Sequence, residues 1–405
     1  VTAGDAAPVV ITDQGATLAY EVTTPGRVTV ALETTFADGS KFTATKPDLA
    51  YAGPHEVFAS TYGANVWPYD TAAKAAWNVN DAIAACGATA ENPGICHLAE
   101  GTYTAANGFG EDAPHIFVLD RPVILRGDNR DFVTLDGENT RRIIRIENEN
   151  AALENVTLTR GADLVGSTAG YGFALHLVKG TVSNCTVSAS YIVNLSPVYA
   201  SDGLIVDTRV TGTTVKNLNK SPLVSLAGRA RMRNCQVVDN TCSRGAVAAD
   251  GANVLIEKTV VQGNTQAGYN YMYDWACPGV RLANGATIVE SLVCSNTVSG
   301  QNGDLTCCAG IRALQGTIDR CIIKDNKGNI NNCYGCGAWL AGTSVIRNSL
   351  VVGNVAKDSA YNYAGGIYLA GGSVQNCTVV GNTTASGSGA DGIYRTSGTV
   401  VNTIV

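Results

Sequence analysis

The stretch VQNCTVVGN, residues 374–382, decides the fold because the chain repeats it many times. When the copies are aligned on the fourth residue of the phrase, successive copies lie 23 to 32 residues apart. An internal period of this length is typical of a solenoid, in which each copy belongs to one coil. Other copies begin at Val182, Met232, Ile256, Ile288, Ile318 and Ile346, and the chain ends in a shortened copy, VVNTIV.

Within the phrase, positions one, four and six are apolar or small and position two is polar. This pattern predicts a strand, a bend and a second strand that share one inward face. We expect the residues at position four to stack in the core: Cys185, Thr208, Cys235, Thr259, Ser291, Cys321, Ser349, Cys377 and Thr403.

Position nine of the phrase is asparagine in six copies. Asparagine tolerates left-handed backbone and can hydrogen-bond to identical residues in a stack, so we expect it at a repeated corner. These residues are Asn240, Asn264, Asn296, Asn326, Asn354 and Asn382.

A second phrase, such as PGVRLANGAT from Pro278 or GGIYLAGGS from Gly365, places glycines on both sides of a short strand. Each coil is therefore predicted to contain about three short strands, and coils stacked about 4.8 Å apart would pair every strand with its neighbours. An antiparallel sandwich is the alternative, but it gives no reason for a phrase that recurs at a nearly constant interval.

Composition limits the class of protein. The 405 residues include 45 Gly and 13 Cys, and the net charge of -6 argues against nucleic acid as the main partner. No apolar run is long enough to cross a bilayer. The cysteines favour an oxidising extracellular or periplasmic compartment, and a start at Val1 is consistent with removal of a leader. We expect no metal and no cofactor.

The chain divides into three predicted parts. Residues 1–52 alternate apolar and polar residues between turns, which predicts a small antiparallel β module. Residues 53–115 are expected to hold a helical cap and the first strands, and residues 116–405 the β-helix. The chain stops midway through a repeat, either because the protein is longer or because another subunit covers this edge and builds head-to-tail filaments.

These phrases resemble those of known repeat proteins. The GG[IAV] and VxxN motifs are similar to the GGAI/FxxN repeats of polymorphic outer membrane proteins, over about residues 117–405. PYDTAAKAAWNVNDAIAAC, residues 68–86, resembles the helix that opens many right-handed parallel β-helix proteins, including the pectate-lyase-like class. The resemblance implies an all-β, right-handed parallel β-helix, and it specifies activity only weakly.

Two cysteine pairs are predicted to form disulfides. Cys277 and Cys308 each precede a strand-opening glycine by two residues on consecutive coils, and one strand spacing lies within disulfide reach. Cys86 is expected to close a loop onto Cys96. The CYGC motif, residues 333–336, lacks the context of a redox or zinc site, so a structural role is favoured.

One outward column carries the candidate site. The residues that follow the strand-opening apolar position are two arginines and three aromatics, and the loops that lead to them are rich in aromatics. Because sugars stack on rings and arginine pairs with carboxylate or sulfate, this face is our candidate carbohydrate-binding groove. The alternative is that the loops fold over the column as a satellite core. The candidates are Arg281, Arg312, Trp339, Tyr368 and Tyr394 in the column, and Tyr271, Tyr273, Asp274, Trp275, Tyr361 and Tyr363 in the loops.

The sequence thus predicts an extracellular bacterial surface rod, adhesin-like and self-assembling into filaments, with a glycan-binding face. The alternative is a polysaccharide lyase or glycoside hydrolase that acts on an anionic polysaccharide, with Arg281 and Arg312 beside Asp274 and Asp304. No catalytic residue is assigned. Three of the four histidines are expected to lie away from this face, and His176 is interpreted as an isolated surface histidine on it.

Overall fold

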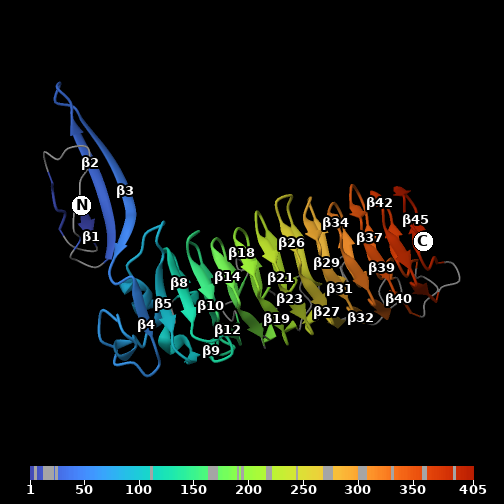
Figure 1. The fold of residues 1–405 in the computed structure, drawn as a ribbon, viewed down its shortest axis with the longest axis horizontal. Coiled ribbons are helices and arrows are strands. Elements are labelled where there is room, and N and C mark those ends of the chain that lie inside the picture. The colour runs from blue at the N-terminus through green and yellow to red at the C-terminus, as the bar shows by residue number, and fades with distance from the viewer. Residues whose placement is uncertain are drawn as a thin grey trace.

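The chain folds into an elongated parallel β-solenoid of about nine turns, from which an N-terminal hairpin projects (Figure 1). The computed structural model describes residues 1–3, 7–11, 22, 26–109, 113–162, 172–188, 191–192, 196–215, 221–242, 245–267, 277–299, 308–329, 333–357, 363–385 and 389–405.

The coils from residue 175 to residue 384 each contribute four strands, one more than expected, whereas the coil over residues 115–136 contributes three. Within the described residues, the strands form four parallel sheets, here sheets I to IV in their order along a coil. Sheet I has 11 strands among these residues: β7 (His115–Leu119), β10 (Arg142–Ile146), β13 (Leu175–Leu177), β17 (Val198–Ala200), β21 (Val224–Ala227), β25 (Gly245–Asp250), β29 (Cys277–Ala283), β33 (Ile311–Ala313), β37 (Ala338–Leu340), β41 (Ile367–Leu369) and β45 (Ile393–Arg395).

Sheets II and III carry the repeated phrase, which runs from a strand of one into a strand of the other. In the described chain, sheet II comprises β4 (Glu56–Ala59), β5 (Gly94–Leu98), β8 (Val123–Gly127), β11 (Ala152–Glu154), β14 (Thr181–Ser183), β18 (Leu204–Val206), β22 (Arg231–Arg233), β26 (Leu255–Glu257), β30 (Thr287–Val289), β34 (Thr317–Asp319), β38 (Val345–Arg347), β42 (Ser373–Gln375) and β46 (Thr399–Val401). Sheet III comprises β6 (Gly101–Tyr103), β9 (Val133–Asp136), β12 (Thr157–Thr159), β15 (Thr186–Ser188), β19 (Arg209–Thr211), β23 (Gln236–Val238), β27 (Val260–Gln262), β31 (Leu292–Cys294), β35 (Ile322–Lys324), β39 (Leu350–Val352) and β43 (Thr378–Val380).

Sheet IV follows the ninth position of the phrase, and its strands are only two or three residues long. Their brevity, with a polar residue at most positions, hid them in the sequence pattern. In the described residues they are β16 (Tyr191–Ile192), β20 (Thr214–Val215), β24 (Thr241–Cys242), β28 (Thr265–Ala267), β32 (Thr297–Ser299), β36 (Lys327–Asn329), β40 (Val355–Ala356) and β44 (Thr383–Thr384).

The bends of the phrase use left-handed backbone at positions three and eight. In the copy from Ile346, Asn348 has a φ of 53° and Gly353 a φ of 65°. Position nine, which we expected to be left-handed, is not among the positive-φ residues, so that part of the prediction is wrong. Small or polar residues such as Asn and Gly suit positions three and eight because a left-handed backbone strains most other side chains.

The asparagines at position nine instead act through their side chains, as a buried ladder. From Asn240 to Asn382, each Nδ2 donates to the Oδ1 of the next asparagine, at 2.9–3.0 Å. Each Oδ1 also accepts from the backbone N–H of the asparagine before it, as Asn326 does from Asn296 at 3.1 Å. A buried amide that satisfies its neighbours in this way fixes the register between coils.

A second ladder runs along position four. The backbone N–H of Cys321 donates to Ser349 Oγ at 3.0 Å, and that of Cys377 donates to Thr403 Oγ1 at 3.4 Å. The predicted core stack at position four is confirmed for Cys185 through Cys377, since these residues are at most 5% exposed. Each of these hydroxyls accepts from the backbone N–H of the position-four residue on the coil before it, as Ser291 does from Thr259 at 3.1 Å.

Asn326→Ala tests the asparagine ladder. The substitution removes Asn326 as the side-chain partner of the Asn296 backbone N–H, the Asn296 side-chain amide and the Val293 carbonyl. Asn354 Oδ1 also loses one donor but keeps the Asn326 backbone N–H. We expect urea unfolding to show a loss of roughly 2–4 kcal/mol, since buried unsatisfied groups are costly. The exposed Asn329→Ala, on the same coil, should cost less than about 0.5 kcal/mol. Equal losses for the two variants would contradict a structural role for the ladder.

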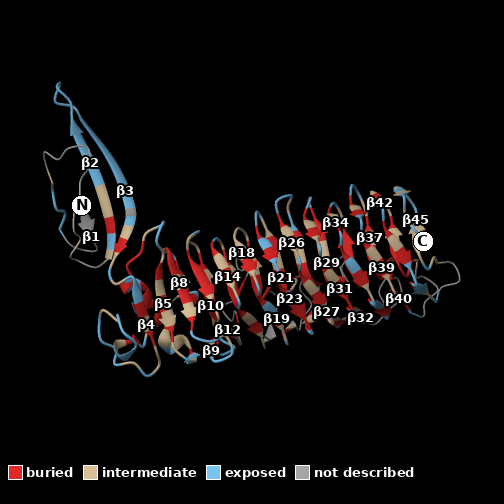
Figure 2. Cartoon of the chain, in the orientation of Figure 1, coloured by how far each residue is buried: buried red, intermediate tan, exposed pale blue. Residues whose placement is uncertain are grey.

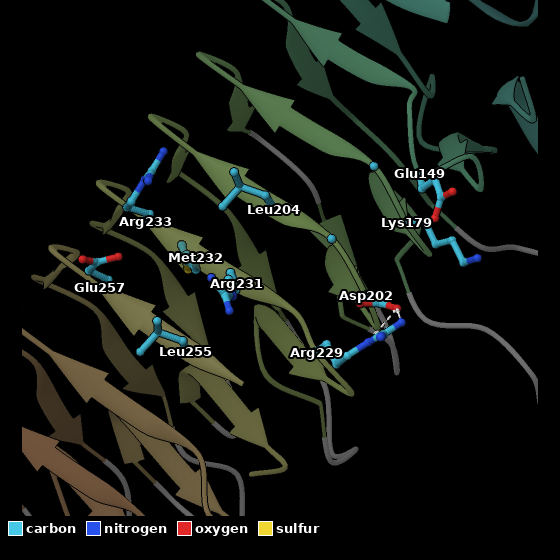
Figure 3. Close-up of a pocket in the computed structure, with 12 residues that line it drawn as sticks. Glu149, Lys179, Asp202, Leu204, Arg229, Arg231, Met232, Arg233, Leu255 and Glu257 are labelled. Carbon is cyan, nitrogen blue, oxygen red and sulfur yellow. Dashed lines mark hydrogen bonds and ion pairs between the residues drawn. The ribbon is translucent and has the colours of Figure 1, made fainter. Parts of the chain in front are cut away.

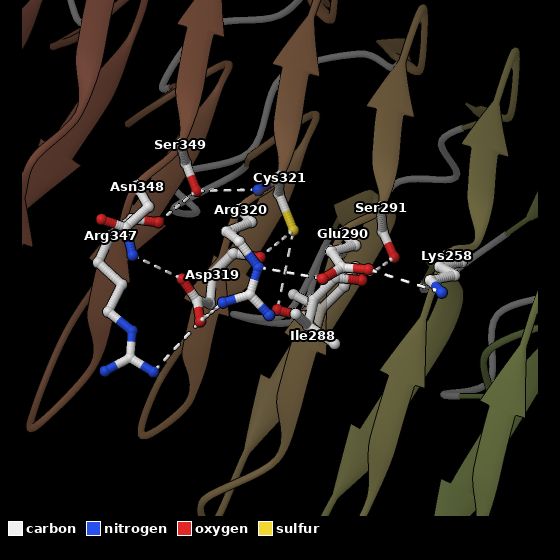
Figure 4. A network of polar contacts seen from close by, with 11 residues as sticks. Lys258, Ile288, Glu290, Ser291, Asp319, Arg320, Cys321, Arg347, Asn348 and Ser349 are labelled. Carbon is white, nitrogen blue, oxygen red and sulfur yellow. Dashed lines mark hydrogen bonds and ion pairs between the residues drawn. The ribbon is translucent and has the colours of Figure 1, made fainter.

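The corner between sheets II and III carries a chain of ion pairs (Figure 4). Asp319 is 5% exposed, and it accepts from Arg320 at 2.9 Å, from Arg347 at 3.2 Å and from Asn348 at 3.0 Å. Arg320 also reaches Glu290 on the preceding coil, at 3.1 Å. Burial alone would raise the pKa of Asp319, but the hydrogen bonds from Asn348 and Arg347 outweigh it and hold the pKa below its usual value.

Asp319→Asn tests the sign of this contribution. A carboxyl whose pKa is lowered by folding stabilises the protein above the pKa of the unfolded state, and this stabilisation is lost as pH falls through the folded pKa. We therefore expect the free energy of unfolding of the wild type to exceed that of Asp319→Asn at pH 7. The difference should shrink below about pH 4. The exposed Asp131→Asn serves as the control, and a difference that grows on acidification would contradict the account.

The N-terminal end differs from the rest. The described part of sheet β1–β2–β3 is antiparallel, with β1 (Thr2–Ala3), β2 (Gly26–Thr35) and β3 (Lys41–Ala52), and most of it is exposed (Figure 2). The expected helical cap is not confirmed. The α-helix content of the described chain is the seven-residue α1 (Val79–Ala85), next to β4 and β7, with short 3₁₀ turns η1 (Ala72–Lys74) and η2 (Ala105–Asn107).

Candidate functional site

The five predicted column residues lie in one register on the outward side of sheet I. Arg281 pairs with Arg312, Arg312 with Trp339, Trp339 with Tyr368, and Tyr368 with Tyr394, each on the neighbouring strand. In β37 and β41 the residues on either side of the column position are fully buried, whereas Trp339 and Tyr368 are half-buried. The side chains of Trp339 and Tyr368 therefore leave the core, as the strand alternation requires, whereas Arg312 in the same register is only 5% exposed.

Within the column, the side chains cover each other's faces. The Arg312 guanidinium lies 4.2 Å from the centroid of the Trp339 ring, a cation–π contact. The rings of Tyr368 and Tyr394 are nearly parallel, 7° apart, with centroids 5.7 Å apart. Because one coil stacks on the next, these contacts direct ring faces along the rod and leave ring edges for the outside. The outward edges of the tyrosine rings carry hydroxyl groups, which bind sugars by hydrogen bonds.

Two tyrosines from the loops pack on this column. Tyr334 meets Tyr368 edge-on at 5.0 Å between centroids, and Tyr363 meets Tyr394 edge-on at 5.2 Å. Tyr334 and Tyr363 therefore fold over the column, as the alternative of a satellite core predicts. All four rings remain half-buried rather than buried, so the cluster keeps contact with solvent. The remaining loop candidates, Tyr271, Tyr273, Asp274, Trp275 and Tyr361, lie outside the described residues.

The indole nitrogen of Trp339 is the polar atom of this patch that lacks a partner among the described residues. Trp339 Nε1 is buried and makes no hydrogen bond. A buried N–H without an acceptor costs about 1–3 kcal/mol. A hydroxyl or carboxylate of a bound ligand would remove that cost.

The same outward column continues toward the N-terminus, where sequence reasoning missed a cluster. The positions in register are Ala248, Ser225, Tyr199, His176 and Arg145. The interpretation of His176 as an isolated surface histidine is wrong, as is the placement of His115 away from this face. Their ring centroids are 5.8 Å apart, and His176 contacts Tyr199 edge-on at 5.6 Å.

Arginines surround the two histidines and shift their protonation. Burial, then the neighbouring His176 and arginines, lowers the pKa of His115 to about 3. Burial, then Arg145 and Arg142, lowers the pKa of His176 to about 4. Both imidazoles are therefore neutral at pH 7. Alignment of HIFVL and RIIRI, which begin at His115 and Arg142, with the later strand-opening phrases would have revealed this cluster.

A separate hollow of about 450 Å³ lies beside the outward side of sheet II (Figure 3). Leu204, Arg231 and Leu255 stand in register on its floor. Arg229 at its edge is directed at Asp202, with Nη2 and Oδ2 2.5 Å apart (Figure 3). This mixture of cationic and acidic side chains favours a polar ligand of either charge. The charged residues of the described lining are Glu149, Lys179, Asp202, Arg229, Arg231, Arg233 and Glu257.

The predicted disulfide partners are buried thiols. Cys277 and Cys308 are fully buried, Cys277 Sγ donates to the Val280 and Gly310 carbonyls at 3.3 Å, and burial raises the pKa of Cys308. Cys86 and Cys96 are also fully buried, in the first coils, and burial raises both of their pKa values. The structure carries all four as free thiols, so the two bridges stay predictions.

Peptide mapping without reductant tests the Cys277–Cys308 bridge. Protein exported to an oxidising compartment should yield a peptide pair joined through these two residues, because their positions on consecutive coils suit disulfide geometry. Cys185 and Cys235 stand two coils apart, and they should be alkylated only after unfolding. Complete alkylation of Cys277 and Cys308 in unfolded, unreduced protein would show that the bridge is absent.

Comparison with known proteins assigns the chain to no family. No family model matches, and no curated protein matches. A mannuronan C-5 epimerase A-module of Azotobacter vinelandii, AlgE6, is 13% identical with a TM-score of 0.32, over 78% of this chain and 91% of that one. The catalytic domain of a GH87 alpha-1,3-glucanase is 12% identical with a TM-score of 0.31, over 76% and 64%. Scores this low carry no argument about activity.

The described residues hold no group of three or more His, Cys, Asp or Glu side chains arranged to bind a metal ion. They also hold no helix that is long and apolar enough to span a membrane. The right-handed winding and the resemblance to polymorphic outer membrane proteins stay predictions. The chain is an all-β parallel solenoid with a polar and aromatic column along one outward face.

Proposed function

We propose that the protein is a rigid extracellular rod that binds an anionic polysaccharide along the outward face of sheet I. The observation that carries this proposal is the unbroken register of Arg281, Arg312, Trp339, Tyr368 and Tyr394 on five successive coils. A polysaccharide is itself a repeat, and a column of side chains at a constant spacing matches a ligand of that kind.

The chemistry of the column favours an acidic sugar chain. Guanidinium groups form strong, charge-assisted hydrogen bonds with carboxylate or sulfate. Tyrosine hydroxyls and the partnerless Trp339 N–H would complete the contacts with sugar hydroxyls. Four strand spacings of about 4.8 Å give the column a length of roughly 19 Å, enough for several sugar units.

The rod itself supports display at a cell surface. The inter-coil ladders resist bending, and the abundance of cysteine favours export to an oxidising compartment. An adhesin-like location outside the cell is part of the proposal. Head-to-tail self-association through the coil at residues 399–405, which would build filaments, also stays a prediction.

A polysaccharide lyase or glycoside hydrolase on the same face is the second candidate. It would share the binding column and differ only in releasing product. The carboxylates expected to assist it, Asp274 and Asp304, lie outside the described residues. Incubation with a polyuronate separates the two functions, because a lyase generates unsaturated ends that absorb ultraviolet light and a hydrolase generates reducing ends.

Affinity electrophoresis in gels that contain alginate or polygalacturonate tests the binding proposal. We expect retardation by both polyuronates and none by neutral dextran. Arg281→Gln and Tyr394→Ala should each weaken binding about tenfold, which corresponds to about 1.4 kcal/mol. Arg209→Gln is the control, because it removes the same charge from an exposed residue of sheet III, and it should bind like the wild type. Equal retardation by dextran, or unchanged binding by the column variants, would contradict the proposal.

A further inference from the structure

The first coils of sheet I bring two histidines and three arginines together. His115 in β7 pairs with Arg142 in β10, and Arg145 in β10 pairs with His176 in β13. The two imidazoles contact each other, with centroids 5.8 Å apart. Arg141, directly before β10, donates through Nη2 to the Ala113 carbonyl at 2.6 Å. Three successive coils therefore contribute to one cluster.

Two nitrogens in this cluster are buried and have no hydrogen-bond partner in the described chain. They are Nε2 of His115, which is 3% exposed, and Nδ1 of His176. A buried polar atom left unsatisfied is rare in native proteins, so these two nitrogens are candidate contacts for a ligand. The adjacent arginines specify the charge of that group, because their fields oppose a positive ligand and favour an anion.

The described side chains around the imidazoles define the electrostatics. Arg142 and Arg145 face them from β10, and Tyr199 faces His176 from β17. The acidic group nearest in sequence, Glu147, lies 2.6 Å from Arg145 Nε. Arg141 adds a further positive field at His115. Three arginines therefore lie around the two imidazoles, and Glu147 pairs with one of them.

We propose that this cluster is a binding site for one hydroxy-carboxylate unit, such as a uronic acid residue of an acidic polysaccharide. The guanidinium groups would take the carboxylate. The imidazole nitrogens can donate to a carboxylate or accept from a sugar hydroxyl, according to the tautomer. The proposal deepens the glycan-binding function, but it uses none of the five residues Arg281 to Tyr394. His176 and Arg281 are four coils apart, roughly 19 Å.

Anion binding at this site is coupled to proton uptake. Burial lowers the pKa values of His115 and His176 to about 3 and about 4. A bound carboxylate opposes the fields of Arg141, Arg142 and Arg145, so it raises both pKa values. Affinity therefore increases as the pH falls from 7 toward 5, as long as the ligand carboxylate stays ionised.

Nuclear magnetic resonance of the full chain with labelled histidine tests the site. The four histidine signals are assigned with single His→Gln variants, and sodium glucuronate, sodium acetate and glucose are the probes. Glucuronate should shift the signals of His115 and His176 but not those of His55 and His97. It should bind at least about threefold more tightly at pH 5 than at pH 7, and acetate and glucose should bind more weakly.

His176→Gln should weaken glucuronate binding at least about tenfold, whereas the exposed His55→Gln should leave it unchanged. Equal shifts at all four histidines, equal binding of glucose, or full affinity in a folded His176→Gln variant would overturn the proposal. If that variant fails to fold, the wild-type titration decides. Glucuronate binding here together with polyuronate binding that is insensitive to Arg281→Gln would uphold this site and refute the column, and the reverse pattern would refute this site alone.

Discussion

The register between neighbouring coils is the constraint on which the whole structure depends. Main-chain pairing alone would tolerate a slip, because parallel strands of two or three residues resemble one another. The buried asparagines remove that freedom, since Asn326 satisfies Asn296 on one side and Asn354 on the other. A slipped coil would leave these amides unsatisfied in the core. The ladder therefore fixes which residue lies above which.

A fixed register converts differences between repeats into surface columns. Inward positions must stay small or apolar to fill the core, so only outward positions are free to vary. On sheet I this variation places Arg281 above Arg312 and Trp339 above Tyr368. It likewise places Arg145 next to His176, six coils or more away from the aromatic patch. One geometric rule thus accounts for both candidate sites and for the distance between them.

The sequence was sufficient to predict the solenoid, the inward stack and the outward column, because each depends on a repeated position. It was less informative where repetition fails. The strands of sheet IV are too short to show a period, and the first coils lack the later phrase, which hid the contact between His115 and His176. The mutual stacking of Tyr368 and Tyr394 was also hidden, because a ring orientation is set by neighbours and not by spacing.

The most direct test of the account is a spin-label distance along one outward column. Residues 209 and 378 lie in the same column of sheet III, six coils apart. Stacked coils in register predict a narrow distribution centred at about 29 Å, six strand spacings. A broad distribution, or a mean displaced by more than about two strand spacings, would show that equivalent positions of successive coils do not stack in register.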